Sequence, residues 1–231
     1  MAPARIARAR IVILTAGLVG TLTLRVPAVE PDQVLELGML TYAAFETAEV
    51  KIAIQTAQRL LASGGIETEW RQCVGNDGCA ESSSGRPFVR VQLLPIMKAA
   101  DPSTSGDAIR ASTVPMVALV YVPRNAEIVQ TLRRSREGRS NPALATLATG
   151  HVVGLTIAHE VGHLLGLSHR SVGVMKPRLS ADDVVMARTS ALVFLPDERD
   201  RMRQAFHALT LDSVTPAEVL ARKSPRDAPR Q

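Results

Sequence analysis

Hydrophobic and polar positions along the first half of the chain follow the period expected of strands. Segments 66–70 (IETEW) and 87–95 (PFVRVQLLP) alternate apolar and polar side chains, which predicts half-buried strands. Segment 114–123 (VPMVALVYVP) is continuously apolar, as expected of a strand that is covered on both faces. Segment 34–45 (VLELGMLTYAAF) is rich in strand-forming residues, so a further strand is predicted there.

Three other segments show the helical period. In 46–65, apolar residues recur three and four positions apart, and Gly64 and Gly65 are expected to end the helix. Segment 143–166 is a long, mostly apolar helical pattern, and 196–210 is an amphipathic one that begins with a proline. The sequence therefore predicts three helices.

The order of these elements indicates the fold class. A strand, a helix and three strands precede helix 143–166, with a polar loop at 101–107. This order predicts a mixed α/β (α+β) fold: a twisted mixed, largely parallel sheet with a backing helix and a second helix that carries the candidate chemistry. We find no internal repeat, so one domain over 29–215 is predicted, followed by a polar, disordered tail at 216–231.

Composition and charge exclude one class of partner. The 231 residues are 46% hydrophobic, which is enough for a buried core. The formal charge of +5 falls to +1 without the four arginines of the first 28 residues. Since so small a charge gives no electrostatic footprint, no nucleic-acid partner is expected.

The N-terminal segment has the pattern of a signal peptide. Three arginines precede the apolar run 11–24, and small residues follow it at 26–28. The run is short for a membrane span, which needs about 20 residues. We predict a signal peptide at 1–28, a mature chain from about Val29, and secreted or periplasmic localisation without stable membrane insertion. The alternatives are a buried first strand or helix, or an uncleaved anchor.

The two cysteines suit an exported protein. Cys73 and Cys79 are close together, and the loop CVGNDGC between them is rich in turn-forming residues. A disulfide between them is predicted. Two free buried thiols and a metal-binding pair are the alternatives.

Three of the five histidines lie in the segment HEVGHLLGLSH, residues 159–169. On a helix, His159 and His163 share one face, so both imidazoles can reach a single zinc ion at about 2.0–2.1 Å. Glu160 is rotated away from the ligands by about a third of a turn, where it can reach a zinc-bound water molecule.

The third ligand is expected from the end of this helix. A glycine at Gly166 can adopt the left-handed conformation and turn the chain back, which allows His169 to supply a third nitrogen. Three histidines leave one position of a tetrahedral ion open, which is the arrangement of a catalytic zinc site.

The segment HEVGHLLGLSH followed by SVGVMKP resembles the metzincin clan of zinc peptidases. The resemblance places Met175 in a methionine turn beneath the histidines and implies a small C-terminal helical subdomain. The short gap from His169 to Met175 resembles the matrixin branch and its bacterial relatives. Arg170 is not the residue that any branch of the clan favours after the third histidine, and Lys176 replaces the tyrosine that often follows the turn methionine.

The residues and the resemblance together predict a secreted zinc-dependent endopeptidase. A zinc-activated water would hydrolyse a peptide bond, with Glu160 as general base and a peptide or protein as substrate. A monomer with one catalytic zinc is expected. The alternative function is an exported zinc-binding module that captures a peptide or inhibitor without turnover.

The remaining candidates are weaker. His151 lies eight residues before His159 and is expected to be a packed or surface residue. His207 is predicted to be structural. Asp101 and Asp107 could bind calcium in their loop, although a solvated polar loop is the preferred interpretation.

Overall fold

The computed structural model describes the segment 159–169 and most of the chain around it. Its described residues are 34–42, 45–73, 82, 85–111 and 114–213. Three predictions concern residues outside these ranges and stay predictions. They are the signal peptide at 1–28, the disordered tail at 216–231 and the disulfide, whose Cys79 is not described.

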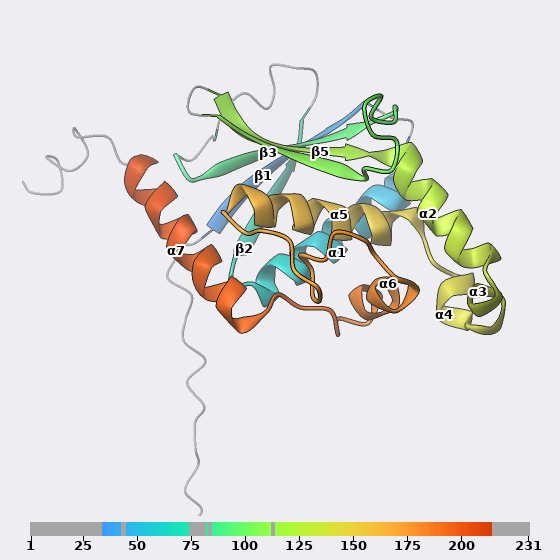
Figure 1. The fold of residues 1–231 in the computed structure, drawn as a ribbon. Coiled ribbons are helices and arrows are strands. Elements are labelled where there is room, and N and C mark those ends of the chain that lie inside the picture. The colour runs from blue at the N-terminus through green and yellow to red at the C-terminus, as the bar shows by residue number, and fades with distance from the viewer. Residues whose placement is uncertain (1–33, 43–44, 74–81, 83–84, 112–113, 214–231) are drawn as a thin grey trace, which may run out of the picture. The chain divides into compact units, whose positions relative to one another are not determined.

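Five strands form a single sheet. They are β1 (Val34–Thr41), β2 (Glu67–Gln72), β3 (Phe88–Leu94), β4 (Gly106–Ala111) and β5 (Val114–Tyr121). Their order in the sheet is β2-β1-β3-β5-β4, and every neighbouring pair is parallel except β4 with β5. The predicted mixed, largely parallel sheet and the α/β fold class are confirmed, and Figure 1 shows helices packed against one face of this sheet.

The alternation in the sequence explains how one face of the sheet is covered. On β3, the side chains of Val89, Val91 and Leu93 are fully buried, whereas the residues between them are partly exposed. Helices α1 (Thr47–Ser63) and α5 (Thr149–Leu164) contact each other, and α5 also packs on β4 and β5. Two helices therefore close the core beneath the sheet (Figure 1).

Two glycines of α5 allow α1 to approach closely. A Cβ atom added to Gly150 would overlap the backbone oxygen of Glu49, and one added to Gly154 would overlap that of Ala53. The Gly150 backbone N–H also donates to the carboxylate of Glu49, which satisfies a donor at the positive end of α5. These contacts fix the helix that carries the histidines.

Several elements differ from the sequence prediction. The prediction missed β4 and the helices α2 (Val122–Arg134), α3 (Arg136–Ser140), α4 (Pro142–Ala145) and α6 (Ala181–Arg188). The predicted loop 101–107 ends where β4 begins, and the apolar run 114–123 contains the boundary between β5 and α2. The predicted helix 143–166 is divided into α4 and α5, because the chain is extended at Ala148.

The final helix begins where the sequence predicted. Helix α7 (Pro196–Ser213) starts at Pro196, and the backbone N–H of Leu195 donates to Oε2 of Glu198 at 2.7 Å. Among the α7 side chains that the structure describes, Glu198, Met202 and Phe206 are buried. In the described part of the chain, no helix is both long and apolar enough to cross a membrane.

Candidate metal centre

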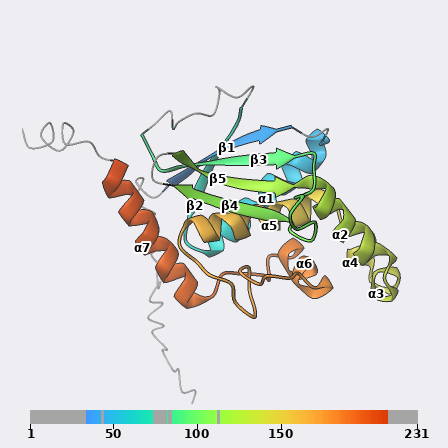
Figure 2. The same ribbon diagram turned by 45° about the horizontal axis from the view of Figure 1, so that its top comes forward.

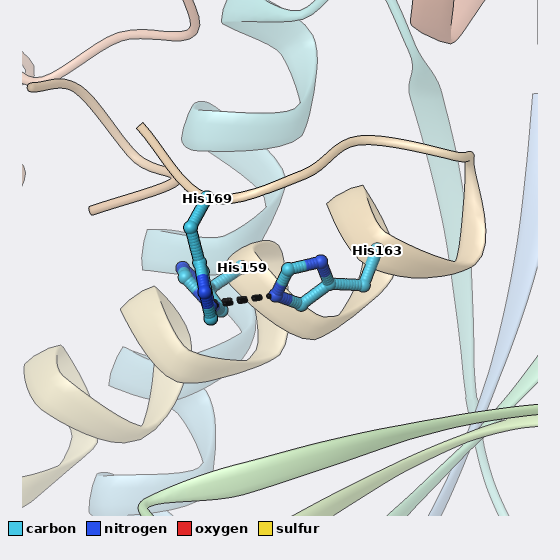
Figure 3. Close-up of side chains that lie close together, drawn as sticks. All are labelled: His159, His163 and His169. Atoms are coloured by element: carbon cyan, nitrogen blue, oxygen red, sulfur yellow. Dashed lines mark hydrogen bonds between the residues drawn. The ribbon is translucent and has the colours of Figure 1, made fainter. Parts of the chain in front are cut away.

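Helix α5 and the turn that follows it bring three histidines together. Nε2 of His163 lies 3.1 Å from Nε2 of His159 and 3.1 Å from Nε2 of His169 (Figure 3). Among the described residues, this is the only group of three or more potential metal ligands that lie within 4.8 Å of one another.

Backbone carbonyls determine the tautomers of the first two rings. Nδ1 of His159 donates to the carbonyl oxygen of Val174 at 2.9 Å, and Nδ1 of His163 donates to that of Leu167 at 2.8 Å. Since a carbonyl can only accept, Nδ1 carries the proton and Nε2 of each neutral ring presents a lone pair. Burial lowers the pKa of His159 to about 4 and also lowers that of His163, so both rings are neutral near pH 7.

The converging nitrogens fit a metal ion. Two lone pairs that face each other at 3.1 Å cannot form a hydrogen bond, and a shared cation removes their repulsion. The ligand nitrogens of a tetrahedral zinc ion lie about 3.3 Å apart when each is about 2.0–2.1 Å from the metal. The donor set and its spacing therefore suit zinc.

The turn after α5 has the geometry that His169 requires. Gly166 has a φ of +83°, its N–H donates to the His163 carbonyl at 2.9 Å, and the Leu167 N–H donates to the Gly162 carbonyl at 2.9 Å. Nothing lies within 4 Å of a Cβ atom placed on Gly166. Position 166 therefore favours glycine because its backbone is in the left-handed conformation, and not because a larger side chain would lack space.

Met175 lies behind the histidines. Its side chain is fully buried, and its Sδ is 2.5 Å from the position that a Cβ atom on Gly162 would occupy. Gly162 belongs to α5 and immediately precedes His163. The thioether thus packs directly on the helix that presents two of the candidate ligands.

Glu160 is buried beside the first strand residue of β4. The residue is 5% exposed, and a Cβ atom on Gly106 would lie 2.7 Å from its Oε1. Burial, reinforced by the nearby charge of Asp107 and opposed by that of Lys98, raises the pKa of Glu160 to about 8. The absence of a side chain at Gly106 makes room for this carboxylate.

Sequence analysis missed a polar cluster next to Glu160. Nζ of Lys98 donates to Oδ1 of Asp107 at 2.7 Å, and the hydroxyl of Tyr121 donates to Oδ2 at 2.7 Å. Burial, together with this bond to Asp107, raises the pKa of Tyr121 to about 12. The residues come from three separate segments, so no local pattern in the sequence could indicate their proximity.

The two carboxylates considered for calcium have protein partners. Both oxygens of Asp107 accept hydrogen bonds in this cluster. Asp101 accepts from the backbone N–H and hydroxyl of Ser103 and from the hydroxyl of Thr104. Both residues line the cleft described below, but neither belongs to the one group of three or more potential metal ligands found among the described residues.

A buried amide connects β4 to α5 and was also missed. Asn125 is fully buried; its Nδ2 donates to the carbonyls of Tyr121 at 2.9 Å and Ser105 at 3.1 Å. Its Oδ1 accepts from the hydroxyl of Thr156 at 2.8 Å. Since Thr156 lies one helical turn before Glu160, this amide fixes the start of β4 relative to Glu160.

These groups share a cleft of about 790 Å³. Its walls include His159, His163, His169 and Glu160, the beginning of β4, and residues 176–179. Strand β4 is at the edge of the sheet (Figure 2), and among the described strands only β5 pairs with it.

The other histidines lie outside the cluster. Nδ1 of His151 accepts from the Ala148 N–H at 3.2 Å, at the start of α5. His207, predicted to be structural, is exposed on α7. Neither contributes to the candidate metal site.

Comparison with known proteins gives only distant similarities. No protein-family model and no curated protein matches the chain. Among solved structures, the chain is similar to an archaemetzincin from Methanopyrus kandleri, with 13% identity and a TM-score of 0.47, over 78% of this chain and 99% of that one. It is also similar to a zinc-dependent peptidase from Methanocorpusculum labreanum, with 12% identity and a TM-score of 0.40, over 73% of this chain and 99% of that one. Similarities this distant do not indicate the activity of the chain.

Proposed function

We propose that the chain is a zinc-dependent endopeptidase of the metzincin clan, close to the matrixin branch. The observation that carries the proposal is the convergence of three imidazole Nε2 atoms in the same cleft as the buried carboxylate of Glu160. Three histidine ligands leave one coordination position for water or substrate, as catalytic zinc sites do.

Each residue of the site has a distinct task in this proposal. His159, His163 and His169 would hold the metal. When bound, zinc makes water more acidic and polarises the carbonyl of the scissile bond. Glu160 accepts the proton of the attacking water and returns it to the leaving amine. The buried position of Glu160 against Gly106 limits the orientations of the carboxylate in the wall of the cleft.

The edge strand supports a peptide as substrate. Residues 105–108, at the start of β4, line the cleft, and the outer side of this edge strand has no partner among the described strands. An extended peptide can hydrogen-bond to such an edge and add a strand to the sheet. A peptide bound there would pass along the wall that contains Glu160.

The proposal is tested with the purified chain, a fluorogenic peptide library and a zinc assay. We expect cleavage that a chelator abolishes and added zinc restores. Glu160→Gln should keep zinc but lose about 10²–10⁴-fold in turnover, the usual contribution of a general base. Near-normal turnover by Glu160→Gln would contradict the assigned role. Zinc and peptide binding without any cleavage would favour the capture module instead.

We also propose that the protein is exported. The basic and apolar pattern of residues 1–28 and the closely spaced pair Cys73 and Cys79 support this proposal. N-terminal sequencing of the expressed protein should give a start near Val29, and mass mapping without reduction should link the two cysteines. An intact N-terminus would contradict cleavage of a signal peptide, and free thiols in the exported protein would contradict the disulfide.

A further inference from the structure

His169 is held differently from the other two candidate ligands. The rings of His159 and His163 donate through Nδ1 to backbone carbonyls, whereas Nδ1 of His169 donates to no atom in the part of the chain that the structure describes. His169 is also the exposed member of the three. Its position therefore depends on how the backbone around it is fixed.

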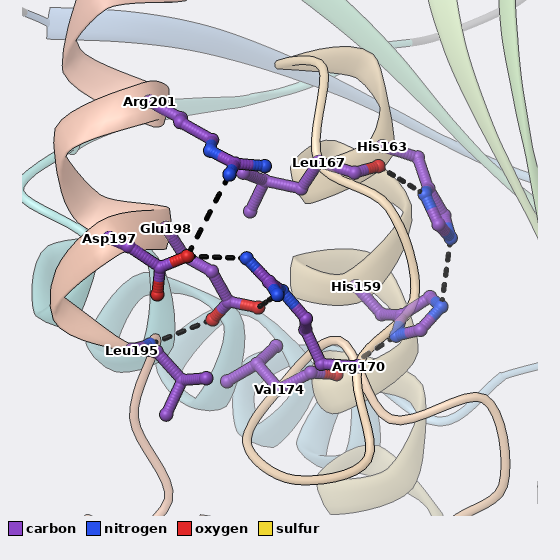
Figure 4. A network of polar contacts seen from close by, with 9 residues as sticks. All are labelled: His159, His163, Leu167, Arg170, Val174, Leu195, Asp197, Glu198 and Arg201. Atoms are coloured by element: carbon purple, nitrogen blue, oxygen red, sulfur yellow. Dashed lines mark hydrogen bonds and ion pairs between the residues drawn. The ribbon is translucent and has the colours of Figure 1, made fainter.

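The next residue, Arg170, fixes that backbone at two points. Its N–H donates to the carbonyl oxygen of Met175 at 2.9 Å, which closes the loop 170–175. Its guanidinium forms an ion pair with Asp197 and lies 3.9 Å, from Nε to Oε1, from Glu198 (Figure 4). Arg170 thus connects the loop beside the histidines to the first turn of α7.

Glu198 gives this connection a buried anchor. Its side chain is 1% exposed; Oε2 accepts from Leu195, and Oε1 has no hydrogen-bond partner among the described residues. Exposed ion pairs contribute little, typically about 0–1 kcal/mol, but a buried carboxylate needs a compensating charge. Arg170 supplies that charge from the loop.

The same loop orients a second ligand. Val174, which accepts the Nδ1 proton of His159, lies within the loop that the bond from Arg170 to Met175 closes. A displacement of Arg170 would therefore move both the backbone of His169 and the acceptor of His159. Groups that orient metal ligands in this way commonly change metal affinity when they are removed.

We infer that Arg170, Asp197 and Glu198 form a latch between α7 and the metal-site loop, and that this latch sets the affinity of the three histidines for zinc. Arg170 is a positioning residue in this inference, since it contacts neither the metal nor the substrate. The inference rests on the metal site of the proposed function, but not on peptide cleavage.

The test measures the zinc dissociation constant of the full chain by competition with a chromophoric chelator. Arg170→Met keeps much of the side-chain volume without the charge and should weaken zinc binding by about 10–100-fold. Glu198→Gln keeps the acceptor for Leu195 and should weaken binding in the same direction. The double variant Arg170→Met/Glu198→Gln should bind zinc only slightly more weakly than Arg170→Met alone, because both changes break the same connection between the loop and α7.

A matched control lies on the same helix. Asp200→Asn removes the exposed ion pair of Asp200 with Arg203, and neither residue belongs to the loop 170–175. The zinc dissociation constant of this variant should stay within about twofold of that of the unmodified protein, since an exposed ion pair contributes little to the stability of the fold. Unfolding of each metal-free variant, followed by circular dichroism, separates lost positioning from lost structure.

Each outcome decides the inference. An unchanged dissociation constant in a folded Arg170→Met protein overturns the latch. If that variant does not fold, Asp197→Asn replaces it, because Asp197 is half exposed; its binding should weaken several-fold, and unchanged binding overturns the latch. Failure of the unmodified chain to bind zinc overturns the metal site and the latch together. Zinc binding without peptide cleavage overturns only the proposed peptidase.

Discussion

At the scale of single residues, backbone carbonyls determine which nitrogen each histidine can offer. The sequence placed His159, His163, Glu160 and Gly166 correctly along the helix and its turn, because their geometry is local and follows from helical spacing. It could not reveal that the carbonyls of Val174 and Leu167 hold two of the rings.

Met175 provides a prediction at this scale. Its side chain is fully buried against Gly162, so Met175→Leu, which conserves volume, should cost less than about 1.5 kcal/mol of unfolding free energy and should retain zinc. Met175→Ala opens a cavity and should cost about 2–5 kcal/mol. Urea denaturation and zinc analysis of both variants check this. Loss of zinc from a folded Met175→Leu protein would show that the sulfur contributes more than packing.

At the scale of elements, the contact between α1 and α5 depends on glycine. Alanine is the better helix former by about 1 kcal/mol, so propensity alone predicts that Gly154→Ala stabilises α5. A Cβ atom there would overlap the backbone oxygen of Ala53, which cannot rotate away. We therefore expect a net loss of about 1–3 kcal/mol in unfolding free energy, measured by urea denaturation.

Gly166 is the comparison for this prediction. A Cβ atom at Gly166 meets nothing within 4 Å, but φ is +83°, so Gly166→Ala should cost about 1–2 kcal/mol through backbone conformation alone. A stabilised Gly154→Ala protein would show that α1 and α5 are further apart than the structure places them.

Helix α6 begins with a charged cap that should make stability depend on pH. Asp183 is buried, which alone would raise its pKa, but bonds from Lys176 and Ser180 outweigh burial and hold the pKa below its usual value. A depressed pKa in the folded state stabilises the fold above the unfolded-state pKa of about 3.9. This contribution is lost as the pH falls through the lower, folded-state pKa.

Asp183→Asn tests that contribution. The difference in unfolding free energy between the unmodified protein and this variant should be constant from neutral pH to about pH 5 and should shrink below about pH 4. Asp182→Asn, at the neighbouring exposed position, is the control and should show a much smaller difference. If the difference in unfolding free energy does not change with pH, Asp183 stabilises the fold through packing and neutral hydrogen bonds and not through its charge.

The elements that the sequence prediction missed have different physical causes. Strand β4 (GDAIRA) is short, and its apolar residues at 108, 109 and 111 do not alternate with polar ones, so its pairing with β5 supplies what its own pattern does not. The boundary between β5 and α2 is hidden within one apolar run. For α6, the reciprocal bonds between Ser180 and Asp183 form a capping box, a signal that was present in the sequence but not used.

At the scale of the whole molecule, the candidate site depends on segments that are distant in the sequence. Helix α5 provides two histidines, the following loop provides the third, and Arg170 connects that loop to α7. The contacts of Lys98, Asp107, Tyr121 and Asn125 likewise join separate elements around Glu160. A local motif can predict the ligand set, but such long-range contacts only become visible in the fold.

Zinc binding should therefore stabilise the molecule as a whole. A ligand that binds only the folded state adds RT ln(1 + [L]/Kd) to the unfolding free energy, about 4.1 kcal/mol at 1,000 times Kd and about 1.4 kcal/mol for each further tenfold. Denaturation at several buffered zinc concentrations should give this slope, and excess chelator should remove the increment.

Two histidine variants test where the zinc binds. His163→Ala removes the central nitrogen of the cluster and should abolish most of the zinc-dependent increment in unfolding free energy. His207→Ala removes an exposed histidine on α7 and should leave the slope unchanged. Equal slopes in both variants would mean that zinc binds elsewhere, because only His163 joins the other two nitrogens of the site.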